Sequence, residues 1–153
     1  MSIYTASIIW NRNDQIFIDQ KYSRAHQWAF DGGVSVPASA SPHIVPLPYS
    51  VEANVDPEEA FVASISSCHM LFFLDISSKK KLLIDSYIDN AEGILEKNTD
   101  GKLAMTRVIL NPTIIFSGKQ PSEELLHKIH HLSHQECFIA NSVKTVVTVK
   151  GVD

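Results

Sequence analysis

Two cysteines and three arginines are the side chains of this sequence best suited to redox chemistry. The thiolate is the nucleophilic form of cysteine, and a nearby cation stabilises it. Arg12 falls in a predicted turn and Arg107 in a strand that can face solvent. Arg24 precedes the glycine-containing segment 31–33 and is therefore the predicted partner of a reactive thiol.

Cys68 and Cys137 are separated by about 70 residues, so no local CxxC motif joins them. Only the fold can bring the two thiols together. If it does, Cys68 can take an oxygen atom from a peroxide, become a sulfenic acid and condense with Cys137 to a disulfide. The alternative is two unrelated buried thiols, because free cysteine is among the most buried residue types.

Cys68 belongs to the most clearly marked helix, which begins at Asp56-Pro57-Glu58-Glu59. Asp56 is the predicted N-cap, and Glu59 completes a capping box. The predicted apolar stripe of this helix consists of Phe61, Ile65, Cys68, Phe72 and Ile76.

Glu58 has two interpretations. As a first-turn carboxylate it complements the helix dipole, as does Glu59. It lies about 15 Å along the helix from Cys68, which is too far for direct contact. Glu58 can therefore serve Cys68 only through an arginine that reaches between them, or across an interface to the site of a second subunit.

A possible metal-binding face is the alternative for the second predicted helix. His130, His134 and Cys137 have the spacing i, i+4, i+7, and the Cys68-His69 pair offers further ligands. The sequence contains no HExxH motif and no paired CxxC motif, and histidines at helical spacing are common without metal. A solvated helix face is therefore the favoured interpretation, and no metal and no cofactor are expected.

The remaining elements predict an α+β fold with mainly antiparallel strands and a single domain over residues 1–153. Strands are expected at 4–10 and 15–19 as a hairpin, at 82–95 and 103–116 around the Asp100-Gly101 turn, and at 142–149. A long irregular segment is expected at 31–56, and the second helix should run from its cap Ser122 to near Cys137.

Composition limits the function classes. The chain has 153 residues, of which 44% are hydrophobic and 20% charged, with a net charge of −4. Without a long basic run, no nucleic-acid partner is expected. No unbroken apolar stretch approaches the roughly 20 residues of a membrane span, and the N-terminus lacks signal-peptide features. The sequence predicts a cytoplasmic protein without a membrane segment, in a compartment that keeps thiols reduced.

These motifs together resemble the OsmC/Ohr family of thiol peroxidases over roughly residues 20–150. The resemblance rests on Asp56-Pro57-Glu58-Glu59-Ala60-Phe61, Ser66-Ser67-Cys68-His69, and the segment from Cys137 to Ser142. It implies an intertwined homodimer in which antiparallel sheets wrap two long central helices, with active sites at the subunit interface. It also implies reduction of organic hydroperoxides by Cys68, resolution by Cys137, an Arg–Glu pair that orients the thiolate, and a dihydrolipoyl-type or other thiol reductant.

The sequence departs from this family in three places. Phe138 replaces the proline that usually follows the second cysteine. The Gly-Gly-Arg loop is absent, so the assignment of Arg24 rests on the scarcity of arginine and on position. The insert at 34–50 contains Ser39, Ser41 and His43 and can change substrate access or the electron donor. Two alternatives stay open: a redox protein of the same fold with a target other than peroxides, and a non-enzymatic dimer that binds a small ligand or a metal.

Overall fold

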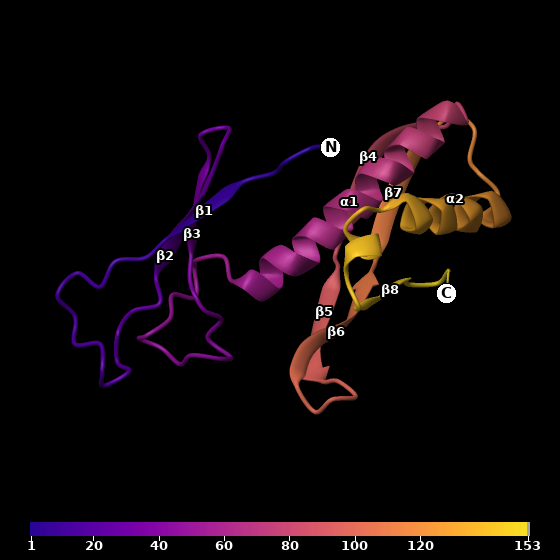
Figure 1. The fold of residues 1–153 in the computed structure, drawn as a ribbon. Coiled ribbons are helices and arrows are strands. Elements are labelled where there is room, and N and C mark those ends of the chain that lie inside the picture. Colours follow the sequence, from indigo (N-terminus) through magenta and orange to yellow (C-terminus); the bar gives the residue numbers. More distant parts are fainter. Residues whose placement is uncertain (153) are drawn as a thin grey trace. The chain divides into compact units, whose positions relative to one another are not determined.

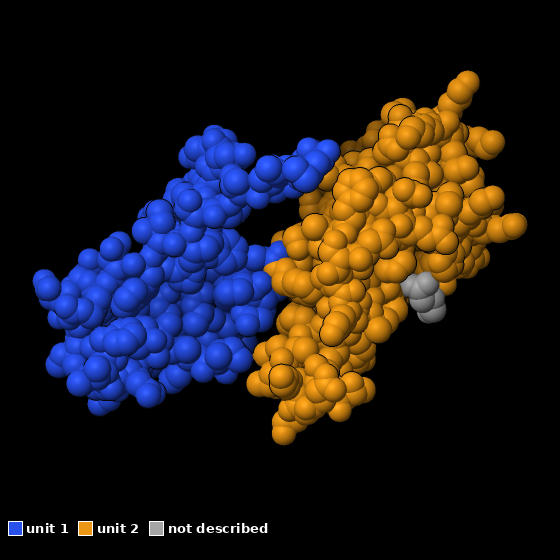
Figure 2. Space-filling view, viewed as in Figure 1, with its two compact units in different colours: residues 1–60 blue, residues 61–153 orange. Residues whose placement is uncertain are grey.

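The computed structural model describes residues 1–152, which form three small sheets and two helices (Figure 1). The chain divides into two compact units, Met1–Ala60 and Phe61–Asp153 (Figure 2).

Unit 1 contains a three-stranded antiparallel sheet in the order β1-β2-β3. Its strands are β1 (Ala6–Ile9), β2 (His26–Phe30) and β3 (Ser35–Ala38). The β2–β3 turn is closed by the Phe30 amide, which donates to the Val34 carbonyl at 2.9 Å, and Gly33 adopts a φ of 88° there. The irregular segment expected at 31–56 is therefore interrupted by a strand, and the part without strands is 39–56.

The expected hairpin of residues 4–10 with 15–19 is wrong, because β1 pairs with β2 and residues 15–19 form no strand. Asn13 and Asp14 both have positive φ, 48° and 63°, which turns the chain out of an extended path. Phe17 then stacks on Tyr22 with ring centroids 4.6 Å apart. Phe17 thus joins a local aromatic cluster rather than a strand face, and Ile16 and Ile18 are exposed.

Helix α1 (Pro57–Lys79) begins where its capping box predicts. The Glu59 amide donates to Asp56 Oδ1 at 2.8 Å, and the Asp56 amide donates to Glu59 Oε2 at 3.2 Å. The fully buried line of the helix is Ile65, His69, Phe73 and Ser77. Apart from Ile65, the predicted apolar stripe is thus displaced by one residue, which leaves Cys68 half-buried beside the buried line.

Within the described residues, α1 is the one helix long and apolar enough to cross a membrane by length and composition. Core helices of soluble proteins pass the same test. The buried line of α1 includes two polar side chains, His69 and Ser77, and it packs into two hydrophobic clusters of unit 2 through Ile65 and Phe73. One side of α1 therefore packs into the interior of unit 2.

Each of the two long β-rich segments of unit 2 forms two strands rather than one. The strands are β4 (Leu83–Asp89), β5 (Glu92–Lys97), β6 (Leu103–Leu110) and β7 (Pro112–Ser117). β4 pairs with β7, and β5 pairs with β6 around the predicted turn, where Gly101 has a φ of 73°. Asp89 stabilises the point where β4 ends and where β6 gives way to β7. Its carboxylate accepts hydrogen bonds from the Asn111 amide at 2.7 Å and from the Ser66 hydroxyl of α1 at 2.5 Å.

The C-terminal part of unit 2 consists of α2 (Glu123–Glu136), a short 3-10 turn η1 (Ala140–Ser142) and β8 (Val146–Val149). The Ser122 cap is confirmed, since its hydroxyl accepts the Leu125 amide at 3.2 Å, and the helix ends at Cys137 as predicted. The last strand is shorter than expected because residues 140–142 turn before it. β8 pairs parallel to β6. Phe73 of α1 and Ile129 of α2 share one core cluster.

Candidate active site

The two cysteines meet where the end of α2 contacts α1. Cys68 is half-buried in the middle of α1, and Cys137, the C-cap of α2, is 1% exposed. Both are free thiols. Burial raises the pKa of Cys137 to about 11, and a hydrogen bond with the Cys68 thiol acts in the same direction. The fold therefore places side by side two thiols that the sequence separates by about 70 residues.

A tight turn fixes the sulfur of Cys137. The Ala140 amide donates to Cys137 Sγ at 3.4 Å, and the Asn141 amide donates to the Cys137 carbonyl at 3.0 Å. The Asn141 side chain also donates to the Gln135 carbonyl at 2.9 Å, which ties the turn back to α2. Cys137 is thus held on both its side chain and its backbone.

Two phenyl rings flank the thiols. Phe72 follows Cys68 by one helical turn and therefore lies on the same side of α1. Its ring meets that of Phe138, the neighbour of Cys137, edge to face with centroids 5.1 Å apart. Phe138 is 71% exposed in the single chain. The half-buried Cys68 thiol consequently has an apolar surface beside it. Phe138, which stands where the family usually has proline, forms the exposed part of that surface.

Arg24 is engaged inside unit 1. Its guanidinium donates to the Gln20 carbonyl at 2.8 Å and to the Tyr22 carbonyl at 2.5 Å, and it lies 3.8 Å from the centre of the Tyr22 ring. These contacts stabilise the loop that leads into β2. They use the cation locally, and the role of Arg24 toward Cys68 stays a prediction.

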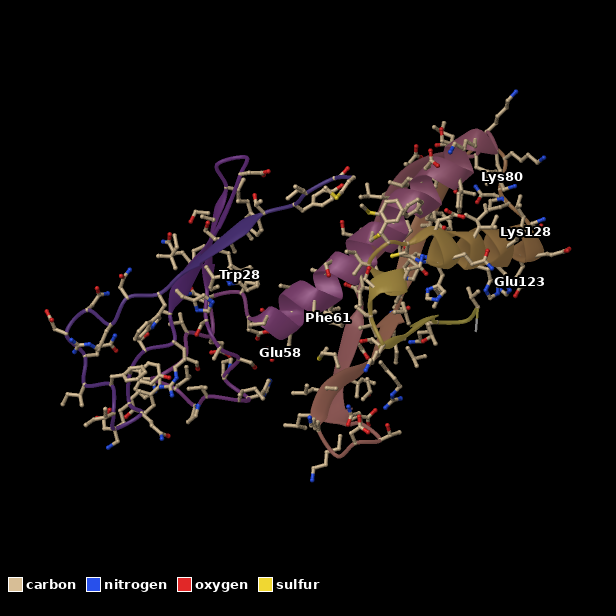
Figure 3. The ribbon with its side chains drawn as sticks, in the orientation of Figure 1. Trp28, Glu58, Phe61, Lys80, Glu123 and Lys128 are labelled. Carbon is tan, nitrogen blue, oxygen red and sulfur yellow. The ribbon has the colours of Figure 1, made fainter. Side chains whose placement is uncertain are left out.

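Glu58 lies in the first turn of α1 (Figure 3). Its side chain is half-buried. Within unit 1 it forms no ion pair with Arg24. Its neighbour Glu59 makes the capping box, so the two adjacent carboxylates have separate tasks. The predicted role of Glu58 toward Cys68, through an arginine or across an interface with a second subunit, also stays a prediction.

The histidines are arranged differently from the predicted solvated face. His134 is exposed, but His130 is 3% exposed and its Nδ1 lies 3.0 Å from Nε2 of His69, which is 1% exposed. His130 thus belongs to the interior. Among residues 1–152, no group of three His, Cys, Asp or Glu side chains is arranged to hold a metal ion. A cavity of about 260 Å³ is lined by His130, His131 and His134 together with residues 147–149 and 152.

In the insert at 34–50, the two serines singled out in the sequence brace the chain. Ser39 is fully buried and its hydroxyl accepts the Val51 amide at 2.9 Å. Ser41 is also buried, and its hydroxyl accepts the His43 amide at 3.2 Å. His43 itself is exposed. Both serines therefore have a structural explanation within unit 1.

The signal that sequence reasoning missed is the pairing of His69 with His130. His69 lies on the buried line of α1, four residues after Ile65, and His130 is buried next to Ile129 on α2. A histidine in the middle of such a line indicates a buried polar contact.

Comparison with known proteins places these features in a family. The profile of the OsmC-like protein family matches residues 51–151, which is about two thirds of the chain. The chain therefore belongs to the OsmC-like protein family. This confirms the family and the α+β fold that the sequence motifs indicated. A comparison with curated proteins found no match.

Among solved structures, the chain is similar to an OsmC-like protein of unknown function from Vibrio cholerae. The two share 57% identity with a TM-score of 0.96, over 98% of this chain and 99% of the other. An organic hydroperoxide resistance protein from Elizabethkingia anophelis is 16% identical, with a TM-score of 0.68 over 97% and 96% of the two chains. A Legionella pneumophila protein described as an organic hydroperoxide resistance protein OsmC is 13% identical, with a TM-score of 0.64 and 97% of each chain covered. The last two likenesses show the shared fold.

Proposed function

We propose that this protein is a cysteine-based peroxidase that reduces organic hydroperoxides. The observation that carries the proposal is the contact between the half-buried Cys68 thiol and the buried Cys137 thiol. A peroxide can reach the first sulfur more readily than the second, because Cys137 is 1% exposed. Cys68 is therefore the attacking thiol and Cys137 the resolving one.

The reaction has three steps. The Cys68 sulfur attacks the terminal peroxide oxygen, so that an S–O bond forms, the O–O bond breaks and the alkoxide leaves as an alcohol with the thiol proton. The Cys137 sulfur then attacks the Cys68 sulfenic acid, an S–S bond forms, and hydroxide leaves as water with the Cys137 proton. A dithiol reductant, of the dihydrolipoyl class that the family resemblance implies, restores both thiols and becomes a disulfide.

The preference for organic over hydrogen peroxide is supported by the rings of Phe72 and Phe138. They form an edge-to-face pair next to the two cysteines, and Phe138 is largely exposed in the single chain. An alkyl or aryl substituent that covers these rings removes apolar surface from water, which stabilises the complex by roughly 25 cal/mol per Å². Hydrogen peroxide has no group that can make this contact.

The working unit is proposed to be a homodimer. Only 22% of the most apolar 18-residue window of α1 is buried within the chain, although this helix is long and apolar. Leu71 on α1 is 60% exposed. A second copy of the chain would cover this helix, and it would also provide the interface at which Arg24 and Glu58 are proposed to orient the Cys68 thiolate.

The test is the rate at which reduced protein consumes cumene hydroperoxide and hydrogen peroxide. Parent protein should react faster with the organic peroxide. Cys68→Ser should abolish the reaction, whereas Cys137→Ser should allow one oxidation and retain a sulfenic acid that a cyclic dione traps. Turnover by the Cys68→Ser variant would contradict the mechanism.

Two other results would support the alternatives. Slow reaction with both peroxides but rapid reaction with disulfides or electrophiles would indicate a thiol-based redox protein with another target. Two unreactive thiols would indicate a binding protein, and the histidine-lined cavity would then be the first place to examine.

A further inference from the structure

A hydrogen bond between two buried histidines joins the helices that carry the cysteines. His69 Nε2 of α1 lies 3.0 Å from His130 Nδ1 of α2, with the ring centroids 5.3 Å apart and the ring planes within 13° of each other. The ring of Phe73 packs on His130 with a centroid distance of 4.5 Å. All three side chains are buried. The contact is therefore a polar one inside the core between α1 and α2.

The histidine pair is closely linked to the cysteine pair along both helices. His69 directly follows Cys68 on α1. On the other side, His130 precedes Cys137 by seven residues, which is two turns or about 10 Å along α2. Because α2 is stiff over that length, the place where His130 contacts α1 determines where Cys137, the C-cap of α2, lies. The thiol contact and the imidazole contact are thus two connections between the same pair of helices.

We propose that the His69–His130 hydrogen bond positions α2 on α1 so that the Cys137 sulfur meets the Cys68 sulfur. The two histidines are positioning residues for disulfide formation, and this inference rests on the proposed function. A hydrogen bond suits this task because it is directional, whereas apolar packing alone tolerates sliding. One imidazole donates and the other accepts, so the bond fixes both rings at one separation.

The tests use variants that keep or remove the bonding atoms. His69→Gln retains a polar atom near the position of Nε2, and His130→Asn retains one near the position of Nδ1. His69→Leu and His130→Leu keep similar volume without a hydrogen bond. His134→Leu is the matched control, since His134 is exposed on the same helix one turn from His130. Recovery in the amide variants separates this bond from the other contacts of the two side chains.

The first measurement is the equilibrium constant of the Cys68–Cys137 disulfide against glutathione, which needs no peroxidase activity. Misplacing reacting groups by about 1 Å lowers reaction rates by up to a hundredfold. We expect the effective concentration of the two thiols to fall about tenfold in the leucine variants, or about 30 mV in reduction potential. The amide variants and His134→Leu should remain close to the parent.

The second measurement follows the two oxidation steps separately. Sulfenic acid formation with cumene hydroperoxide should be unchanged in the leucine variants, while its condensation with Cys137 should slow about tenfold. A purely structural role would lower the thermal stability of the reduced protein without changing this ratio of rates. If a leucine variant does not fold, His69→Phe keeps a flat ring in place without the nitrogen.

The outcomes distinguish the two proposals. If the parent forms the disulfide and the leucine variants have the same glutathione constant and the same condensation rate, the positioning role is wrong and the proposed function stands. If the parent forms no disulfide with either glutathione or peroxide, both are overturned.

Discussion

At the scale of single residues, the two thiols differ in accessibility. Cys137 is 1% exposed and burial raises its pKa to about 11, so it is held as a thiol at neutral pH. Cys68 is half-buried and can be reached. In the proposed mechanism, this difference in accessibility assigns the attack on peroxide to Cys68 and the later resolving step to Cys137.

The raised pKa of Cys137 makes the stability of the reduced protein depend on pH. The folded state keeps the proton up to about pH 11, whereas the unfolded chain loses it near 9.0. This contribution is therefore fully present below about pH 9 and is lost as the pH rises toward 11, by about 2 to 3 kcal/mol.

Urea unfolding of the reduced parent and of the reduced Cys137→Ser variant, between pH 8 and about 11, measures this contribution of Cys137 to stability. The free energy of unfolding of the parent should fall more steeply than that of the variant. Equal slopes would show that Cys137 keeps an ordinary pKa in the folded state.

Phe138 provides the residue-level test of substrate preference. Phe138→Ala removes the exposed half of the aromatic pair next to the thiols. The second-order rate constant with cumene hydroperoxide should fall about tenfold, since an aromatic contact of this kind contributes about 1 kcal/mol or more. The rate with hydrogen peroxide should not change, and it serves as the internal control. An equal loss of rate with both peroxides would show that the organic substituent of the peroxide does not bind at Phe138.

Sequence reasoning at this scale found the cysteine pair but not the pairing of His69 with His130. The cysteine pair followed from the likeness of two separated motifs to one family. His69 and His130 were singled out only as possible metal ligands, because neither spacing nor composition shows that two residues about 60 positions apart will share a buried hydrogen bond. Contacts of that kind depend on how α1 and α2 cross.

At the scale of elements, local signals fixed the helix ends. The capping box at Asp56 and Glu59 and the cap at Ser122 form as predicted, because each needs only residues within four positions. The strands were harder to predict. Residues 15–19 alternate like a strand but lose that path at Asn13 and Asp14. The two long β segments divide where Asp89 binds across to Asn111, a contact that the linear pattern does not contain.

The two adjacent carboxylates at the start of α1 allow a matched test. Glu59→Ala removes a capping partner and should lower the free energy of unfolding by about 1 kcal/mol, with little change in the peroxide rate. Glu58→Gln should leave stability nearly unchanged and slow the peroxide reaction, if Glu58 orients the thiolate. Chemical unfolding and peroxide kinetics on both variants provide the comparison. If Glu58→Gln lowered stability without slowing the peroxide reaction, Glu58 would have no role in orienting the thiolate.

At the scale of the whole molecule, unit 2 leaves apolar side chains exposed on α1 and on strands β4 and β7. Leu71, Leu83, Ile88 and Ile115 are each more than half exposed in unit 2. Single exposed apolar residues are ordinary, but a long apolar helix of which only 22% of the most apolar window is buried indicates a helix surface that is covered. A second copy of the chain is the proposed cover.

Sedimentation equilibrium tests the homodimer. The mass should be twice 17.0 kDa at micromolar concentration. Leu71→Lys, which puts a charge on the uncovered part of α1, should raise the dissociation constant by about tenfold or more, since burying an unpaired charge is costly. A parent that sediments as a monomer throughout would contradict the dimer and, with it, the interface role of Arg24 and Glu58.

The most direct test of the central claim is mass spectrometry of the reduced protein after one equivalent of cumene hydroperoxide. The peroxidase mechanism predicts that the intact mass falls by two hydrogen atoms and that a peptide pair joined through Cys68 and Cys137 appears within the time of peroxide consumption. Two free thiols with the peroxide unconsumed would contradict it, and so would a stable oxygen adduct on Cys68 with Cys137 unreacted.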